Sequence, residues 1–570
     1  MDTRAHSSIA GRSDLYPLGH HHLDRTLLDR PPNIGSDLGR AALMRALGAP
    51  SSGPLSVPVF RALWIATIVS NIGTWMNDVG AGWLMTTLRP DPLMVALVQA
   101  ATTLPMFLLA LPAGALADIF DRRKLLIGAQ IFSLLAASLL AATTLLGLTT
   151  PWLLLGFTCL IAIGSALSAP AFQAVVSELV SGADLQRAVT LNGLAVNIAR
   201  AIGPALGGVL VAMSGPGGVF ALNAISTVGV VLVLVHWQRT VPAPSLPPEH
   251  FIGALRAGAR YALGSDELQT VLFRAFGFFL FASGFWALLP LIARQELGLG
   301  PTGYGGLLAF MGLGAVAGAA LLPQMRSRLS TNGLTIAASL TLAAAMVALS
   351  FAKSFQFGAL ALLIGGFAWI AMMAALNGGA QVSAASWVKA RSLAVYLLVF
   401  QGAMTAGSMV WGLVAGQIGI ASTLHIAAAA LAVATIVLAR WKPLGRTAAL
   451  DLTPSLHWPA PILEGEVEAD QGPVLVTIEY QIDPERFNEF KHAMQALERV
   501  RRRDGAISWG LYEDVSRRGL ILEHFIAESW LEHLRQHERV TKSDQDLQNA
   551  AKAFHIGDKP PSVRHLLAKR

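Results

Sequence analysis

The chain has 570 residues, of which 54% are hydrophobic and only 14% are charged, and its formal net charge is +7. A typical soluble protein carries about a quarter charged residues, so this composition excludes a single soluble globule. The charge is also uneven, because residues 471–570 hold 31 of the 77 charged side chains. These numbers predict a polytopic membrane protein that ends in a soluble tail.

The N-terminal region and the cysteine count add further limits. Residues 1–57 are polar and rich in Pro, Gly and Arg, and the first apolar run starts near Phe60, so no secretory signal is expected. The triplet His20 to His22 suits a metal ion, but a solvated tail is the favoured interpretation, and Met44 is an alternative start. The single Cys159 excludes an intrachain disulfide and a thiolate metal cage.

Apolar windows long enough to cross a bilayer recur along the body of the chain. A hydrocarbon core of roughly 30 Å requires about 20 apolar residues in a helix. Twelve such windows fall at 60–88, 93–117, 124–147, 151–176, 186–214, 217–237, 268–294, 302–324, 332–352, 355–377, 391–417 and 419–441.

The basic residues in the short loops predict the orientation. One set of loops carries eleven of them, namely Arg122, Arg123, Lys124, Arg187, Arg239, Arg256, Arg260, Arg326, Arg328, Lys389 and Arg391. The opposite set carries only Arg89, Arg294 and Lys353. Because basic loops stay inside, both termini are expected in the cytoplasm, in an inner (plasma) membrane. The same reasoning assigns the net positive charge to topology, so no nucleic acid partner is expected.

An internal repeat divides the twelve windows into two groups of six. Five pairs of residues are 204 positions apart: Gly114/Gly318, Arg122/Arg326, Arg187/Arg391, Gly203/Gly407 and Gly208/Gly412. The longest loop, about 238–267, separates the sixth window from the seventh. Two halves repeated in parallel are typical of transporters of the major facilitator type.

The loop after the second window has a recognisable pattern of glycine, acidic and basic residues. It contains Gly114, Asp118 and the basic cluster Arg122 to Lys124. It resembles the signature loop of the major facilitator superfamily, with Ile119 and Asp121 as departures from the usual Arg and Gly. The resemblance implies a conformational latch made by Gly114, Asp118, Arg122 and Arg123. Physically, Gly114 permits close packing, and Asp118 can cap a helix or accept from Arg122. The alternative is a simple positive-inside anchor.

The fifth window contains a second motif, Gly203, Pro204, Gly207 and Gly208. It resembles the antiporter signature of major facilitator drug exporters, although packing glycines are common in membrane bundles. With the upstream segment 197–200 and the segment 71–78 of the first window, the likeness narrows to an enterobactin-exporter-like efflux subgroup. The fourth window lacks the family's usual arginine.

Charged side chains in mid-membrane are costly and are therefore candidates for function. Asp78 and Arg200 are the clearest, and we expect them to form a polar centre that couples protons to substrate. The expected pathway residues are Asn71, Trp75, Asp78, Gln99, Asn192, Asn197, Arg200, Trp286 and Gln401. The alternative for the neutral ones is an interhelical hydrogen bond or an interface anchor.

The tail is predicted to alternate strands and helices in the order βαββαβ, with one helix from Trp530 to about Ala553. This order is ferredoxin-like and resembles the antibiotic-biosynthesis monooxygenase domain family, whose members often form dimeric α/β barrels. Trp530, His533 and His537 at helical spacing, with His524 on a strand, suit a pocket for an aromatic substrate or haem. The favoured interpretation is a regulatory or dimerising module with solvated or structural histidines.

The expected fold is an all-α polytopic membrane protein with twelve transmembrane helices in two six-helix repeats, followed by an α+β ferredoxin-like domain. The expected domains are a disordered cytoplasmic tail (1–57), two six-helix bundles (58–237 and 268–442), linkers (238–267 and 443–472) and the cytoplasmic domain (473–570).

The expected function is a proton-coupled exporter of a siderophore, drug or metabolite, not an enzyme, with no cofactor and no metal site. Its partners are the bilayer, the substrate, protons and, through the tail, a second copy. No Gly-x-x-x-x-Gly-Lys-Ser/Thr loop occurs, which disfavours a built-in ATP motor. The alternatives are a membrane-tethered enzyme whose tail modifies the transported compound, and a sensor that transports nothing.

Overall fold

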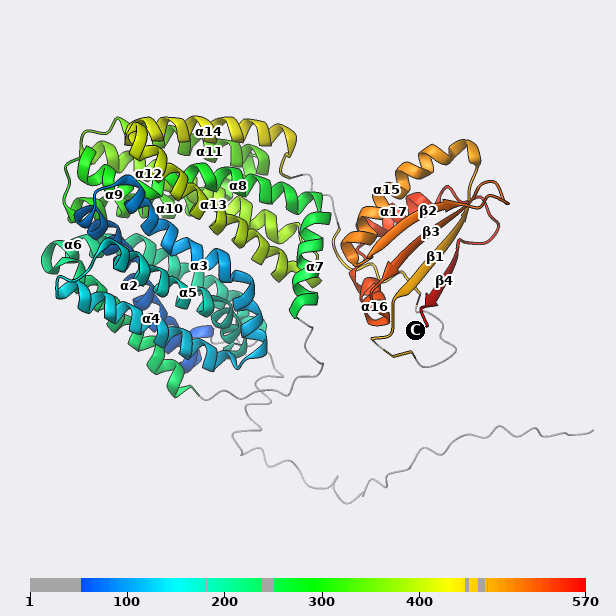
Figure 1. Cartoon of the computed structure of the whole chain (residues 1–570), viewed down its shortest axis with the longest axis horizontal. Coiled ribbons are helices and arrows are strands. Elements are labelled where there is room, and N and C mark those ends of the chain that lie inside the picture. The colour runs from blue at the N-terminus through cyan, green and yellow to red at the C-terminus, as the bar shows by residue number, and fades with distance from the viewer. Residues whose placement is uncertain are drawn as a thin grey trace, which may run out of the picture. The chain divides into compact units, whose positions relative to one another are not determined.

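The computed structural model describes residues 53–180, 182–237, 251–445, 451–459, 467, 468 and 470–569. These residues form a helical bundle and a smaller α+β domain, which we call the tail, and each is described by itself (Figure 1). The predictions for residues 1–52, including the histidine triplet, lie outside the described residues.

Within the described ranges, eleven helical segments are long and apolar enough to cross a membrane. They are α2 (Pro58–Leu88), α3 (Pro92–Ile119), α4 (Arg122–Leu145), α5 (Pro151–Leu179), α6 (Gly182–His236), α8 (Asp266–Ala287) with its extensions α9 (Leu289–Leu291) and the π-helix η3 (Ile292–Glu296), α10 (Pro301–Arg328), α11 (Thr331–Ser350), α12 (Phe355–Val382), α13 (Lys389–Ile418) and α14 (Ile420–Trp441).

Helix α6 accounts for the difference between eleven segments and the twelve predicted spans. It has 55 residues, and Gly215 within it has a non-helical backbone with φ 73° and ψ 173°. At 1.5 Å per residue, the segment would be about 82 Å long, more than twice the hydrocarbon thickness. Gly215 therefore joins two spans, and the described residues contain the twelve spans that the sequence predicts.

The helices begin where the sequence supplies caps. Asp91 accepts from the backbone N–H of Met94 at 3.1 Å, and Asp121 accepts from Lys124 at 2.9 Å. These side chains satisfy N–H groups that have no partner inside their helices. Capping was expected of Asp118, but Asp121 caps α4, and the side chain of Asp118 lies outside what the structure describes.

The internal repeat is also a repeat of contacts. Gly203 of α6 packs on α2, and its counterpart Gly407 of α13 packs on α8. Gly208 of α6 packs on α10, and its counterpart Gly412 packs on α3. Since α8 and α10 occupy in the second half the places of α2 and α3 in the first, the same pair of contacts occurs twice with the halves exchanged. This confirms the division into two groups of six.

A further helix, α7 (Phe251–Gly264), occurs in the segment predicted as a linker. Tyr261, which is 1% exposed, fixes its end. The Tyr261 hydroxyl donates to the carbonyl of Ser383 at 3.0 Å and accepts from the N–H of Ala385 at 3.1 Å. The linker helix is thus bound to the turn that follows α12.

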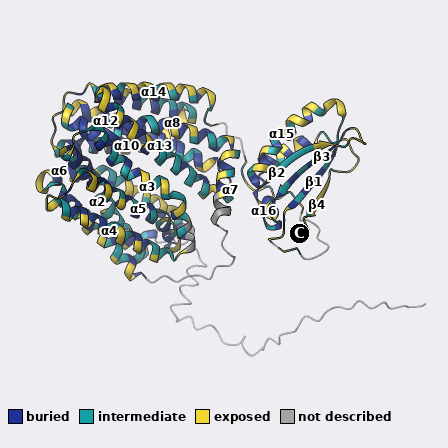
Figure 2. Cartoon of the chain, in the orientation of Figure 1, coloured by how far each residue is buried: buried dark blue, intermediate teal, exposed yellow. Residues whose placement is uncertain are grey.

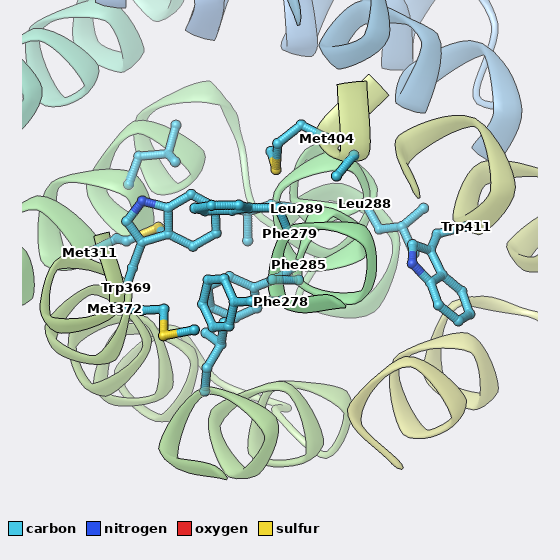
Figure 3. Close-up of a cluster of buried hydrophobic side chains, with 14 of the residues drawn as sticks. Phe278, Phe279, Phe285, Leu288, Leu289, Met311, Trp369, Met372, Met404 and Trp411 are labelled. Atoms are coloured by element: carbon cyan, nitrogen blue, oxygen red, sulfur yellow. The ribbon is translucent and has the colours of Figure 1, made fainter. Parts of the chain in front are cut away.

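The core of the second half is aromatic. Figure 3 shows Phe278 and Phe285 of α8 beside Met372, and Trp369 of α12 beside Met311 of α10. The ring of Trp369 lies 5.8 Å from that of Phe278. Exposed large apolar residues instead lie on outward helix faces, as Figure 2 shows by colour. Apolar residues on the outside suit a lipid environment.

The tail has the predicted ferredoxin-like order. Residues 470–569 hold a four-stranded antiparallel sheet in the order β2-β3-β1-β4. The elements are β1 (Val474–Gln481), α15 (Phe487–Asp504), β2 (Ser508–Glu513), β3 (Leu520–Ala527), α16 (Trp530–Arg539), α17 (Lys542–Lys552) and β4 (Ser562–Leu567).

The single helix predicted over 530–553 is wrong in one respect, because the chain forms two helices there. Val540 is extended, and Thr541 caps α17 in a capping box with Asp544. The Thr541 hydroxyl accepts from the N–H of Asp544, and the Asp544 carboxylate accepts from the N–H of Thr541 at 2.9 Å. The sequence Thr-x-x-Asp carries the signal for this break.

A buried ion pair joins α15 to the sheet. Arg501 donates from Nε to Oε1 of Glu523 at 3.0 Å, and the two side chains are 4% and 0% exposed. Trp509 and Tyr480 also donate to the Glu523 carboxylate, at 3.1 and 3.3 Å. A buried carboxylate is tolerated only when it is paired and hydrogen-bonded, as it is here.

We expect Arg501→Met to destabilise the tail by about 3–5 kcal/mol, because it leaves the buried Glu523 charge without its cation. The matched control is Arg564→Met, which removes an exposed pair with Glu479 and should cost about 0–1 kcal/mol. The measurement is the denaturant midpoint of tail proteolysis in the full-length protein. Equal midpoints for the two variants would contradict the assigned role of the pair.

Candidate functional site

The two halves meet most closely at the face of the bundle that carries residues 89–91 and 297–300, which we call the distal face. The proximal face is the opposite one, where α2 begins and α14 ends. An added Cβ at Gly208 would lie 2.7 Å from the Pro301 carbonyl oxygen and 2.8 Å from Cα of Gly305. These neighbours are backbone atoms, so only glycine permits this approach of α6 to α10.

Polar contacts reinforce the distal contact. Arg294 of η3 donates to the hydroxyls of Thr86 and Thr87 on α2, at 3.1 and 2.9 Å. Its guanidinium also lies 5.7 Å from the ring centre of Trp83, which stacks on Tyr304 of α10. Sequence reasoning treated Arg294 only as a topology residue. The structure shows that it joins the two halves.

The centre of the bundle holds a cation among indole rings. The Arg200 guanidinium lies 5.6 Å from the ring centre of Trp75. Trp75 lies 6.4 Å from Trp286, and Trp286 lies 5.4 Å from Trp369. Among the described residues, Nε of Arg200 and Nε1 of Trp286 are buried with no hydrogen-bond partner. Such orphaned donors suit a ligand that brings acceptor atoms.

Asp78 lies one turn along α2 from Trp75, on the same face. Its neighbours are Asn77 of the same helix and Tyr304 of the second half, which lies within electrostatic range. No ion pair in the described part of the chain joins Asp78 to Arg200. The predicted faces of α2 and α6 do turn toward the second half, but in this state the two charges have different neighbours.

A polar cavity of about 300 Å³ lies in the proximal part of the first half. Two predicted pathway residues, Asn71 and Asn192, lie on its wall. Its other polar lining residues are Thr67, Ser70, Thr74, Gln130, Ser133, Ser165, Ser168, Gln173, Asn223 and Thr227. No charged side chain is among the described lining residues, so the cavity suits water and neutral polar groups.

The remaining predicted pathway residues have structural partners. Asn197 donates to the carbonyl of Gly193 in its own helix, which matches the hydrogen-bond alternative. The carbonyls of Gln99 and Gln401 accept from Thr103 and Thr405 at 3.0 and 2.8 Å. These two threonine hydroxyls are hydrogen-bonded to each other at 2.7 Å, which joins α3 to α13.

The predicted latch residues are bound within the first half. Arg122 donates to Glu178 of α5 at 2.8 Å, a partner that sequence reasoning missed. Arg123 donates to the last carbonyls of α6, those of Leu234 and Val235, at 2.8 and 2.6 Å. An added Cβ at Gly114 would meet nothing within 4 Å, so the close packing expected there is absent among the described atoms.

Arg274 is a buried intramembrane charge that sequence reasoning missed. It is 3% exposed and donates to the carbonyl of Thr435 at 3.1 Å and to Asn332 and Thr335 at 2.7 Å each. These contacts join α8 to α11 and α14. An arginine within the seventh apolar window was the available signal.

Twelve spans in two repeated halves, joined by glycine contacts around a polar centre, define a membrane transporter of the major facilitator class. The family described as "Transmembrane secretion effector" matches residues 49–570, and the chain belongs to that family. The match includes the tail.

Two relatives carry names. The chain is 29% identical over 172 residues to the staphyloferrin A transporter of Staphylococcus aureus, a match that covers 30% of this chain and 43% of the relative. It is 28% identical over 269 residues to the enterobactin exporter EntS of Shigella flexneri, which covers 46% of this chain and 62% of the relative. The chain thus spans between four and just over six tenths of these two relatives' lengths.

Solved structures agree on the fold. A bacterial homologue of the lysosomal transporter Spinster, captured inward-facing and unoccupied, has a TM-score of 0.54 at 14% identity, covering 69% of this chain and 97% of its own. The nucleoside transporter NupG has a TM-score of 0.52 at 12% identity, covering 67% and 98%. At such low identity these likenesses concern the fold alone.

We expect Gly208→Ala to open the distal face. The added methyl would press on the backbone of α10, and overpacking of this kind costs about 1–3 kcal/mol, so the closed state should lose roughly tenfold in population. In a Cys159→Ser background, a cysteine placed at Thr103 should react faster with an impermeant maleimide added from the distal side. The control is Gly193→Ala on the same helix, where a Cβ meets nothing within 4 Å. Unchanged labelling in the Gly208 variant would refute this contact's role in closure.

Proposed function

We propose that this protein is a proton-coupled exporter of a small organic molecule that works by alternating access. The observation that carries the proposal is the central group of Arg200, Trp75, Trp286 and Trp369, where the two halves meet. A site at mid-membrane between repeated halves can be exposed to either side when the halves rock.

The arrangement of contacts supports a distal-closed state. Gly208, Gly305 and Arg294 hold the halves together at the distal face. The polar cavity lies on the proximal side, and there Gly114 has no packing neighbour within 4 Å. We infer that the latch of Gly114, Asp118, Arg122 and Arg123 engages the second half when the proximal face closes. Release of the distal glycine contact would accompany that closure.

The chemistry of the central group favours an organic anion with flat or aromatic parts as substrate. The guanidinium supplies a cation and hydrogen-bond donors, and the indoles supply flat apolar surface. The names of the relatives, a staphyloferrin A transporter and an enterobactin exporter, support a siderophore-type molecule. The neutral polar cavity would then serve as its hydrated approach from the proximal side.

Asp78 is the proposed proton carrier. Its carboxylate is the acidic group nearest the centre on α2, and Tyr304 places it at the junction of the halves. A mid-membrane carboxylate exchanges protons when its surroundings change between polar and apolar. The driving force suffices: about 150 mV gives one proton about 3.5 kcal/mol, or roughly a 300-fold substrate gradient. Arg200 would lower the proton affinity of Asp78 in states that bring them together.

We expect Asp78→Asn to abolish substrate accumulation driven by a pH gradient while preserving substrate exchange, since exchange requires no net proton movement. Both are measured in proteoliposomes, with a catecholate or carboxylate siderophore as the probe. The control is Asp91→Asn, which keeps the helix cap of α3 because Asn caps as well as Asp. A Asp78→Asn protein that still concentrates substrate would exclude this carboxylate as the coupling group.

We propose that both termini lie in the cytoplasm, on the basis of eleven basic residues against three in the opposing loops. A reporter that is active only in the periplasm, fused after Arg570, should stay silent, while the same reporter fused after Leu148 should be active. The reverse pattern would invert the topology and with it the direction of transport.

The tail is proposed to regulate the bundle or to mediate self-association. Its helices cover one face of the sheet, and the other face presents half-buried apolar residues such as Leu475, Leu522 and Ile526. An apolar sheet face of this kind suits a second copy of the tail, as in dimeric α/β barrels. The resemblance to monooxygenase domains leaves an enzyme tethered to the transporter as the alternative, to be tested by oxygen uptake and haem binding.

A further inference from the structure

Three histidines of the tail converge, although they come from two distant segments. His533 and His537 lie one turn apart on α16, and His565 lies on β4. One ring nitrogen from each lies within 4.8 Å of the other two. Sequence reasoning named His533 and His537 but not His565, because only the pairing of β4 with β1 brings this third ring to the helix.

The separation of the helix pair matches that of two ligands on one ion. Nε2 of His533 and Nε2 of His537 are 3.3 Å apart. Two imidazole nitrogens at 2.0–2.1 Å from a tetrahedral zinc ion lie about 3.3–3.4 Å apart. The ring of His565 lies 4.8 Å from that of His533, so a side-chain rotation suffices to bring its nitrogen to the same point.

Without an ion, this cluster is poorly satisfied. His533 is 1% exposed, its Nδ1 has no hydrogen-bond partner among the described residues, and the same holds for both amide atoms of Gln536 beside it. Burial lowers the pKa of His533 to about 3 and that of His537 to about 4, so the rings are neutral. Neutral imidazole is the form that binds metals.

The surroundings resemble those of a metal centre. Trp530 packs on His533 with ring centres 5.5 Å apart, and Trp458 packs on His537 at 4.8 Å. The nearby cation Arg501 is neutralised by Glu523 at 3.0 Å. When His533 binds through Nε2, its Nδ1–H becomes a donor, and the unpartnered Gln536 can accept it after a side-chain rotation, as second-shell groups do.

We propose that His533, His537 and His565 bind one divalent first-row transition-metal ion, with zinc as the best-fitting example. An all-imidazole set favours zinc, copper, nickel or ferrous iron over magnesium or calcium. Three protein ligands leave a fourth position for water or an outside ligand. The ion would fasten the last strand of the tail to α16.

The test uses the full-length protein in detergent, with His20→Ala, His21→Ala and His22→Ala as background, because the N-terminal triplet is a competing site. Equilibrium dialysis should give one Zn²⁺ per chain. His537→Gln and His565→Gln, both at half-buried positions, should each weaken binding at least tenfold. His492→Gln, at an exposed position on α15, should change nothing.

A second measurement needs no substitution in the cluster. Co²⁺ added to the background protein should give the strong visible absorption of a four-coordinate ion, and Zn²⁺ should remove it. Weak six-coordinate absorption, or Zn²⁺ binding to the His537 and His565 variants as strong as to the His492 variant, would overturn the proposal. Loss of binding in those two variants with unchanged unfolding of the metal-free tail would support it.

Discussion

The close approach of α6 to α10 at Gly208 and Gly305 is the contact on which the rest of the bundle depends. Within lipid, backbone groups are satisfied inside each helix, so two halves can meet only as helix against helix. Apolar side chains gain little from leaving lipid for protein, and close backbone packing must supply the attraction. A Cβ at either glycine would lie under 3 Å from backbone of the other helix, so only glycine permits this junction.

This constraint explains why polar groups gather beside the glycines. Once the helices approach closely, Arg294 reaches Thr86 and Thr87 across the junction, and Trp83 stacks on Tyr304. Toward the centre the helices diverge enough to admit Arg200 and three indoles. The contact is short, dry and easily separated, unlike an interlocked apolar core. A junction of this kind can open and close without unfolding either half, which alternating access requires.

The fold could be predicted largely from the sequence because its determinants are local. Twelve apolar windows, the 204-residue repeat and the strand order of the tail each follow from patterns that one segment carries. The misses concern long-range partners. Glu178 as partner of Arg122, Arg294 on Thr86, and His565 beside His533 join segments that no periodicity relates. The break at Val540 was readable from the capping box at Thr541, but the amphipathic pattern continued across it.

The two halves repeat in their backbone contacts but not in their charges. The 204-residue offset pairs Asp78 with Ala282 and Arg200 with Met404, so the mid-membrane charges of the first half have apolar counterparts. The second half contributes Trp286 and Trp369 to the centre instead. Rocking therefore moves an apolar aromatic wall past two fixed charges and changes their surroundings without any helix carrying a charge across the membrane. Such a division lets one half bind the proton while the other sets how strongly it is held.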